Sequence, residues 1–96
     1  MSDTVNAAVE ALNKKLAGEG FDGVAKFVIE DEGSLVVDGD GARAGDGDAD
    51  VTLTADADTF EQILGGDLDP TAAFMSGKLA IDGDMGAAMR LGQVLS

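Results

Sequence analysis

The sequence predicts an α+β domain in which helices pack on one face of a mainly antiparallel sheet. The expected elements follow the order helix, four strands, two helices, strand, helix along the 96 residues. Strands and helices therefore come in runs and do not alternate, which is typical of an α+β fold. Apolar and polar residues alternate in the expected strands, as they do in a sheet with one solvated face. We expect a single domain spanning residues 1–96.

The first helix begins at Ser2 or Asp3, because either side chain can accept a hydrogen bond from a backbone N–H at the helix start. Gly18 and Gly20 are expected to end it. Its apolar residues recur at helical spacing, namely Val5, Ala8, Val9, Leu12 and Leu16. Two strands follow, at residues 24–30 and 34–38, and the turn 31–33 joins them into an antiparallel hairpin.

Residues 38–50 are nearly all Asp, Gly and Ala, a composition that raises the question of calcium. An EF-hand loop begun at Asp46 has Val51 where glycine is needed and Ala57 where the bidentate Glu belongs. A loop begun at Asp38 fails earlier, at Ala42. We expect a solvated connection with a short edge strand near residues 42–44, and calcium binding is kept as an alternative.

The second half of the chain has clear helix boundaries. Residues 51–54 form a strand, Asp56 or Asp58 caps a helix, and residues 65–66, both Gly, end it. Asp69 caps the next helix, with Pro70 at its first position, and Gly77 ends it. Residues 78–82 alternate as a strand, and the last helix follows Asp84 as its cap.

The last helix has an unusually wide apolar arc. Its apolar residues spread over roughly 220°, against about 100° for an ordinary amphipathic helix, and are Met85, Ala88, Met89, Leu91, Val94 and Leu95. A sheet alone does not cover such an arc. A second copy, a loop or a bound ligand is needed to cover the rest.

A pattern of residues in the second half of the chain resembles the sterol carrier protein type 2 lipid-binding domains. The residues that carry the resemblance are Ala49 to Thr54, Phe60, Gly65 or Gly66, Pro70, Ala73, Phe74, Met75, Gly77, Lys78, Leu79, Ile81, Gly83, Asp84, Ala88 and Leu91. The resemblance implies a five-stranded sheet and an apolar tunnel between the sheet and the helices.

Under this resemblance, the tunnel is lined by apolar residues on the inward faces of the helices. They are Leu12, Leu16, Phe60, Ile63, Leu64, Phe74, Met75, Met85 and Met89. Each also suits ordinary core packing, although methionine adapts well to variable ligands. Lys78 and Arg90 are candidates for contact with an acidic lipid headgroup, and each also suits a plain surface charge.

Composition excludes several classes of function. The chain has no cysteine and no histidine, so the usual nucleophilic triads and transition-metal ligands are absent. The formal net charge of −13 argues against nucleic acid and against anionic membrane surfaces. We expect no catalytic residue, no metal and no cofactor. We also expect neither a secretion signal nor a transmembrane span, no stable membrane insertion, and the cytoplasm as the compartment.

The resulting hypothesis is a non-catalytic lipid-binding or lipid-transfer domain that holds one fatty acyl, acyl-CoA or sterol-like ligand. The alternative is a structural or interaction domain with a self-filled core, which dimerises or binds a partner through the apolar face of its last helix. Monomer and dimer both stay open. Carboxylate-based hydrolysis or calcium binding through residues 38–50 is a third possibility.

Overall fold

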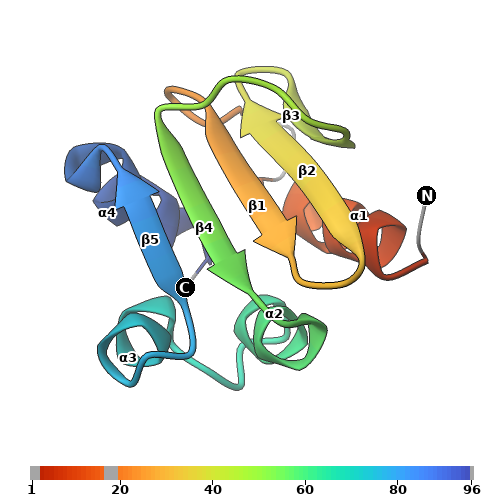
Figure 1. Ribbon diagram of the computed structural model, residues 1–96. Coiled ribbons are helices and arrows are strands. Elements are labelled where there is room, and N and C mark those ends of the chain that lie inside the picture. Colours follow the sequence, from red (N-terminus) through yellow and green to blue (C-terminus); the bar gives the residue numbers. More distant parts are fainter. Residues whose placement is uncertain (1–2, 17–19, 96) are drawn as a thin grey trace.

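The computed structural model describes residues 3–16 and 20–95 and confirms the predicted order of elements. The elements are α1 (Asp3–Leu16), β1 (Ala25–Ile29), β2 (Gly33–Asp38), β3 (Gly41–Ala44), β4 (Val51–Ala55), α2 (Ala57–Leu64), α3 (Pro70–Met75), β5 (Ala80–Gly83) and α4 (Met85–Leu95) (Figure 1). The predicted cap at Ser2 and the predicted stop at Gly18 lie outside the described residues.

The five strands form one mixed sheet in the order β3-β2-β1-β4-β5. Three neighbouring pairs are antiparallel, and only β1 and β4 run parallel, with Phe27 opposite Leu53. The edge strand expected near residues 42–44 is β3. The sheet is therefore mainly antiparallel, as the sequence predicts.

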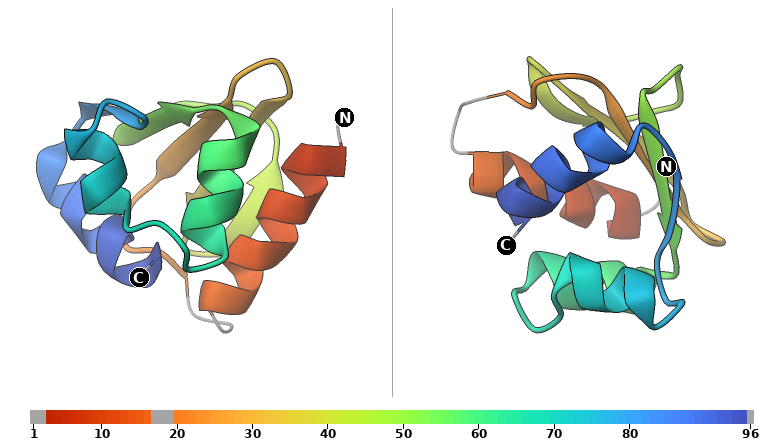
Figure 2. Two further views of the ribbon diagram at one scale, coloured as in Figure 1. Left: turned by 90° about the horizontal axis from the view of Figure 1, so that it is seen from below. Right: turned by 90° about the vertical axis from the view of Figure 1, so that its left-hand side faces the viewer.

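The four helices lie on one side of the sheet (Figure 2). Strand residues on that side are buried, and the rings of Phe27 and Phe60 pack 5.4 Å apart at 43°, between the sheet and α2. The opposite face of the sheet carries partly exposed residues such as Lys26, Thr52 and Thr54. This arrangement confirms the predicted α+β class and places the core between the sheet and the helices.

Three helices start where short-range capping places them. Asp56, and not Asp58, caps α2 by accepting the Thr59 N–H at 2.8 Å. Asp69 accepts the Thr71 N–H at 3.2 Å in front of Pro70. Asp84 accepts N–H groups of α4, which fixes the start of the last helix. Each carboxylate satisfies backbone donors that a helix start leaves without partners.

Strand β5 starts later than the sequence predicts. Residues 78–82 were the expected strand, whereas β5 spans Ala80–Gly83. The N–H groups of Lys78 and Leu79 donate to the carbonyl of Ala73 at 2.9 and 3.1 Å. Because these donors close the end of α3, they are not used for pairing with β4, and the strand begins two residues later.

Two ion pairs involve carboxylates of the Asp/Gly-rich stretch at residues 38–50. Arg43 pairs with Asp38 at 2.7 Å, and Lys26 pairs with Asp46. Within residues 3–16 and 20–95, no three His, Cys, Asp or Glu side chains gather closely enough to hold a metal ion. Two of the carboxylates in the stretch are instead engaged with cations.

Candidate functional site

An apolar pocket lies between α3, β5 and α4 and is backed by β4. We call it the α3–α4 pocket; its volume is about 140 Å³. It is lined by Leu53, Pro70, Thr71, Phe74, Leu79, Ile81, Met85, Ala88, Met89, Gly92 and Leu95. Leu53, Leu79 and Leu95 are buried at its floor, whereas Met85 and Met89 are exposed at its mouth.

The chain builds this pocket from short-range features. Asp69 and Pro70 start α3, and Gly77, with φ of 83°, reverses the chain after it. A glycine suits this position because a left-handed backbone is strained for other residues. Leu79 follows, with its N–H donating to the Ala73 carbonyl, and it is part of the pocket lining. On α4, Gly92 lines the pocket without filling it, because a β-carbon there would meet no atom within 4 Å.

The chemistry of the α3–α4 pocket is apolar. Thr71 is the one polar residue in the lining, and no lining residue is ionisable. The pocket can therefore bury hydrocarbon and offer a single hydroxyl, and it supplies no group for acid–base or nucleophilic catalysis.

A second pocket, of about 400 Å³, lies between α1 and α2, and we call it the α1–α2 pocket. Its lining is Asp3, Thr4, Ala7, Ala8, Ala11, Ile29, Ala57, Phe60, Glu61 and Leu64. Small side chains on α1 leave the groove open. Two carboxylates take part in the lining, so this pocket is more polar than the α3–α4 pocket.

The structure divides the nine predicted lining residues among four places. Phe74, Met85 and Met89 line the α3–α4 pocket, and Phe60 and Leu64 line the α1–α2 pocket. Leu12, Leu16 and Ile63 are buried in the core and line neither pocket. Met75 also lines neither and is 80% exposed. A single tunnel through all nine residues is not shown, and the ligand contacts of these residues stay a prediction.

Sequence reasoning overlooked the strand side of the α3–α4 pocket. The prediction was limited to helix faces and so omitted Leu53, Leu79 and Ile81. A signal was present, because Leu79 and Ile81 alternate with Lys78, Ala80 and Asp82 and so share one face. Gly92 carried no apolar signal, because it has no side chain and takes part in the pocket only by leaving space open.

Neither of the two predicted headgroup cations is part of the lining of the α3–α4 pocket. Lys78 is exposed in the segment after α3. The hydrogen bonds from Thr59, aided by the charge of Lys78, hold the pKa of the Asp56 carboxyl below its usual value. The Arg90 side chain reaches back toward the first turn of α4. A β-carbon added at Gly86 in that turn would lie 3.8 Å from the Arg90 Nη1.

The wide apolar arc of α4 is only partly covered. Ala87, Ala88, Leu91 and Leu95 are buried, whereas Met85 and Met89 are 50% and 71% exposed. Among the described helices, none combines the length and the apolar character that crossing a membrane requires.

Curated relatives match this chain along one part of their length. Hydroxysteroid dehydrogenase-like protein 2 of Xenopus tropicalis is 36% identical over 96 residues, which cover 92% of this chain and 23% of that protein. The protein of the same name from Danio rerio is 48% identical over 44 residues, which cover 46% of this chain and 11% of the relative. The chain thus spans about a quarter or less of these relatives.

Solved structures share the fold. The crystal structure of sterol carrier protein 2-like 2 from Aedes aegypti matches with a TM-score of 0.79 at 22% identity, covering 95% of each chain. The solution structure of sterol carrier protein 2 from the same organism, in complex with palmitate, matches with a TM-score of 0.77 at 23% identity, covering 100% of this chain and 97% of that one. The model of the SCP-2 sterol transfer family matches residues 4–96. The chain therefore belongs to the SCP-2 sterol transfer family.

Proposed function

We propose that this domain binds one lipid in the α3–α4 pocket and carries it without altering it chemically. The ligand class is a fatty acid, an acyl-CoA or a sterol-like molecule. The observation that carries the proposal is the lining itself, which is apolar apart from Thr71 and contains no ionisable group. Such a site gains its affinity from removing hydrocarbon from water.

Family membership supports this choice of function. The matching family is described as one of sterol transfer, and a structural neighbour from Aedes aegypti holds a C16 fatty acid. The named dehydrogenase-like relatives are much longer than this chain, so their dehydrogenase description is not carried over to it. Carriage without catalysis agrees with a pocket that has no acid, base or nucleophile in its lining.

The pocket must widen to take a whole lipid chain. Sites for small molecules measure roughly 300–1,000 Å³, and an apolar cavity of about 150 Å³ accommodates benzene. At about 140 Å³, the α3–α4 pocket holds a few methylenes as it stands. Phe74, Met85 and Met89 are exposed at the mouth, so they can turn outward without leaving a packed core. Methionine side chains adopt new rotamers at low cost.

The expected affinity is moderate. Burying about fourteen methylenes at ~0.8 kcal/mol each gives ~11 kcal/mol before costs. Subtracting ~5 kcal/mol for lost translation and chain freedom leaves ~6 kcal/mol, which corresponds to tens of micromolar. This affinity permits both loading and release, as a carrier requires.

The test is a calorimetric titration with palmitate, an acyl-CoA and cholesterol, using two matched variants. Gly92→Leu fills the open part of the pocket with a side chain and should abolish binding. Ala72→Leu adds the same side chain at an exposed position of α3 outside the lining, so it should bind like the wild type. Native mass spectrometry of freshly purified protein should show co-purified lipid. Saturable binding to none of the three ligands would refute the proposal.

A further inference from the structure

We propose that the α1–α2 pocket is a second ligand site, which takes a small amphiphile that carries an amine or a quaternary ammonium group. The two pockets are separate, because no residue lines both of them. The inference therefore goes beyond the proposed lipid carriage and does not depend on it.

The α1–α2 pocket is large enough for such a molecule. Its volume of about 400 Å³ lies within the roughly 300–1,000 Å³ of small-molecule sites. An apolar cavity of about 150 Å³ accommodates benzene, so this pocket has room for a body of about two rings or for a short alkyl chain. Ile29 and Phe60 are buried in its lining, and Leu64 is half-buried there. Contact with these side chains removes the hydrocarbon of a ligand from water.

The pocket is open because α1 has short side chains along this side. Ala7, Ala8 and Ala11 line the pocket from α1, and Ala57 lines it from the first turn of α2. Helices that pack directly on each other fill the space between them with interlocking side chains. The alanines leave that space to a ligand, and Ala7 is exposed at its edge.

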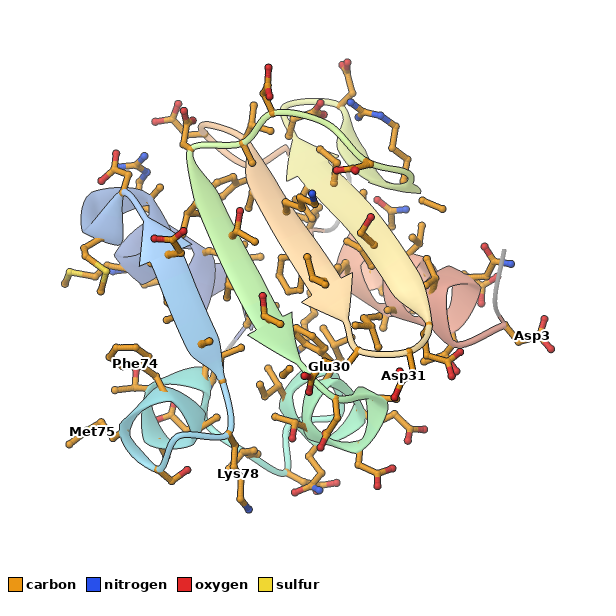
Figure 3. All side chains as sticks on the ribbon, viewed as in Figure 1. Asp3, Glu30, Asp31, Phe74, Met75 and Lys78 are labelled. Atoms are coloured by element: carbon orange, nitrogen blue, oxygen red, sulfur yellow. The ribbon has the colours of Figure 1, made fainter. Side chains whose placement is uncertain are left out.

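The end of the pocket where both helices begin is acidic. Asp3 in the first turn of α1 lines it, as does Ile29, the last residue of β1. Glu30 follows, and its N–H donates to the Ala55 carbonyl just before α2. Figure 3 shows Glu30 and Asp31 at this end of β1, with Asp3 projecting from the start of α1. A positive group at this end of the pocket would therefore meet carboxylates from α1 and from the turn after β1.

The charged groups of the lining are both carboxylates. Glu61, one helical turn into α2, is the second beside Asp3. Among the described residues, no Lys or Arg forms an ion pair with either of them. Lys78 acts on the Asp56 carboxyl and is not part of the lining. Such a pocket complements an apolar molecule with a positive charge and disfavours a fatty acid of the same length.

The experiment is a calorimetric titration of the full chain with decyltrimethylammonium, and with decanoate as the matched anion. Both probes carry a ten-carbon chain and are used below the concentration at which they form micelles. Ala7→Leu places a longer side chain in the α1–α2 pocket and should abolish binding of the cation. Palmitate affinity should stay unchanged in this variant, because Ala7 does not line the α3–α4 pocket. Gly92→Leu should leave binding of the cation intact, because Gly92 lines only the α3–α4 pocket.

A second variant tests the charge and keeps the shape. Glu61→Gln removes one lining carboxylate and should weaken binding of decyltrimethylammonium about threefold, the size expected for an exposed ion pair. Added KCl should reduce this difference. Asp40→Asn is the control, because it changes the net charge equally in the turn after β2. That turn lies at the opposite end of the sheet, since β2 runs antiparallel to β1, and the control should bind like the wild type.

Three results would overturn the second site. One is equal affinity of Ala7→Leu and the wild type for the cation. Another is loss of the cation in Gly92→Leu, because the amine would then occupy the α3–α4 pocket. The third is decanoate binding that Ala7→Leu abolishes, since the α1–α2 pocket would then not select a positive charge. If the cation binds as expected while palmitate fails to bind, the second site stands and the proposed function falls.

Discussion

The side chain of Asn13 in α1 makes two hydrogen bonds to the backbone of Ala42 in the edge strand β3. Its Nδ2 donates to the Ala42 carbonyl at 3.1 Å, and its Oδ1 accepts the Ala42 N–H at 2.8 Å. Asn13 thereby takes the position that a neighbouring strand would occupy. The contact joins the first helix to the edge of the sheet and covers part of that edge, which would otherwise be open to pairing with another chain.

Asn13→Ala should destabilise the fold by about 1 kcal/mol. Two hydrogen bonds at ~0.5–1.5 kcal/mol each are lost, and the better helix propensity of alanine returns roughly 0.5 kcal/mol. Urea unfolding measures the change. Asn6→Ala is the matched control, because Asn6 is exposed on the same helix, and its stability should equal or slightly exceed that of the wild type. Equal stability of the two variants would show that the contact contributes nothing.

The features that the sequence predicted correctly depend on neighbouring residues. Asp69 and Pro70 determine where α3 starts, because the capping bond and the fixed φ act within two or three residues. The apolar spacing of the first helix leaves Asn13 on its polar face, whereas the partner of Asn13 is 29 residues away in sequence. Periodicity gives the face on which a residue lies but not what it meets there.

The same limit applies to the candidate site. Phe74, Met85 and Met89 were predicted as lining residues and do meet at one pocket, because α3 and α4 both border β5. Leu12 and Ile63 had equally strong apolar patterns and lie in the packed core. Whether an inward residue touches a ligand or another side chain depends on how closely the elements approach, which the sequence pattern does not specify.

Gly83→Ala should destabilise the fold by about 2 kcal/mol or more. Gly83 has φ of 111°, which is strained for a residue with a side chain, at a cost of roughly 1–2 kcal/mol. A β-carbon there would also lie 2.4 Å from the Asp50 carbonyl oxygen and 3.0 Å from the Val51 Cα, so the backbone of β4 would have to shift. Thermal unfolding monitored by circular dichroism is the measurement.

The control for this prediction is Gly47→Ala. A β-carbon at Gly47 meets nothing within 4 Å, so the substitution should be neutral or should stabilise the fold slightly by restricting the unfolded chain. If Gly83→Ala unfolds at the same temperature as Gly47→Ala, the close approach of Gly83 to Asp50 is not a constraint on the fold.

Asp56→Asn should lower stability at neutral pH, with the difference disappearing in acid. The hydrogen bonds from Thr59 and the charge of Lys78 hold the pKa of Asp56 below its usual value. Its ionised form is therefore favoured in the folded state. The resulting stability is present above the unfolded pKa of about 3.9 and is lost as the pH falls through the folded value.

Asparagine also caps helices, so this variant keeps the acceptor and removes only the charge. Unfolding curves of the wild type and Asp56→Asn should converge as the pH falls below about 4. Asp58→Asn, on the same helix but not at the cap, serves as the control and should show a smaller difference at neutral pH. A gap that stays constant across this pH range would contradict the assigned cause.

Added KCl should raise the melting temperature, because salt weakens the repulsion among the carboxylates more than it weakens the ion pairs. Screening removes part of the self-repulsion of a chain with net charge −13, which stabilises the compact state. It also weakens the ion pairs Lys26–Asp46 and Arg43–Asp38, but exposed pairs of this kind contribute only about 0–1 kcal/mol each. At about 1 M salt the Debye length falls to ~3 Å, so repulsion between distant carboxylates is largely screened.

Removing two exposed charges by Asp40→Asn and Asp48→Asn should raise the melting temperature at low KCl and change it little at high KCl. A melting temperature that falls as KCl is added would show that the ion pairs outweigh the repulsion.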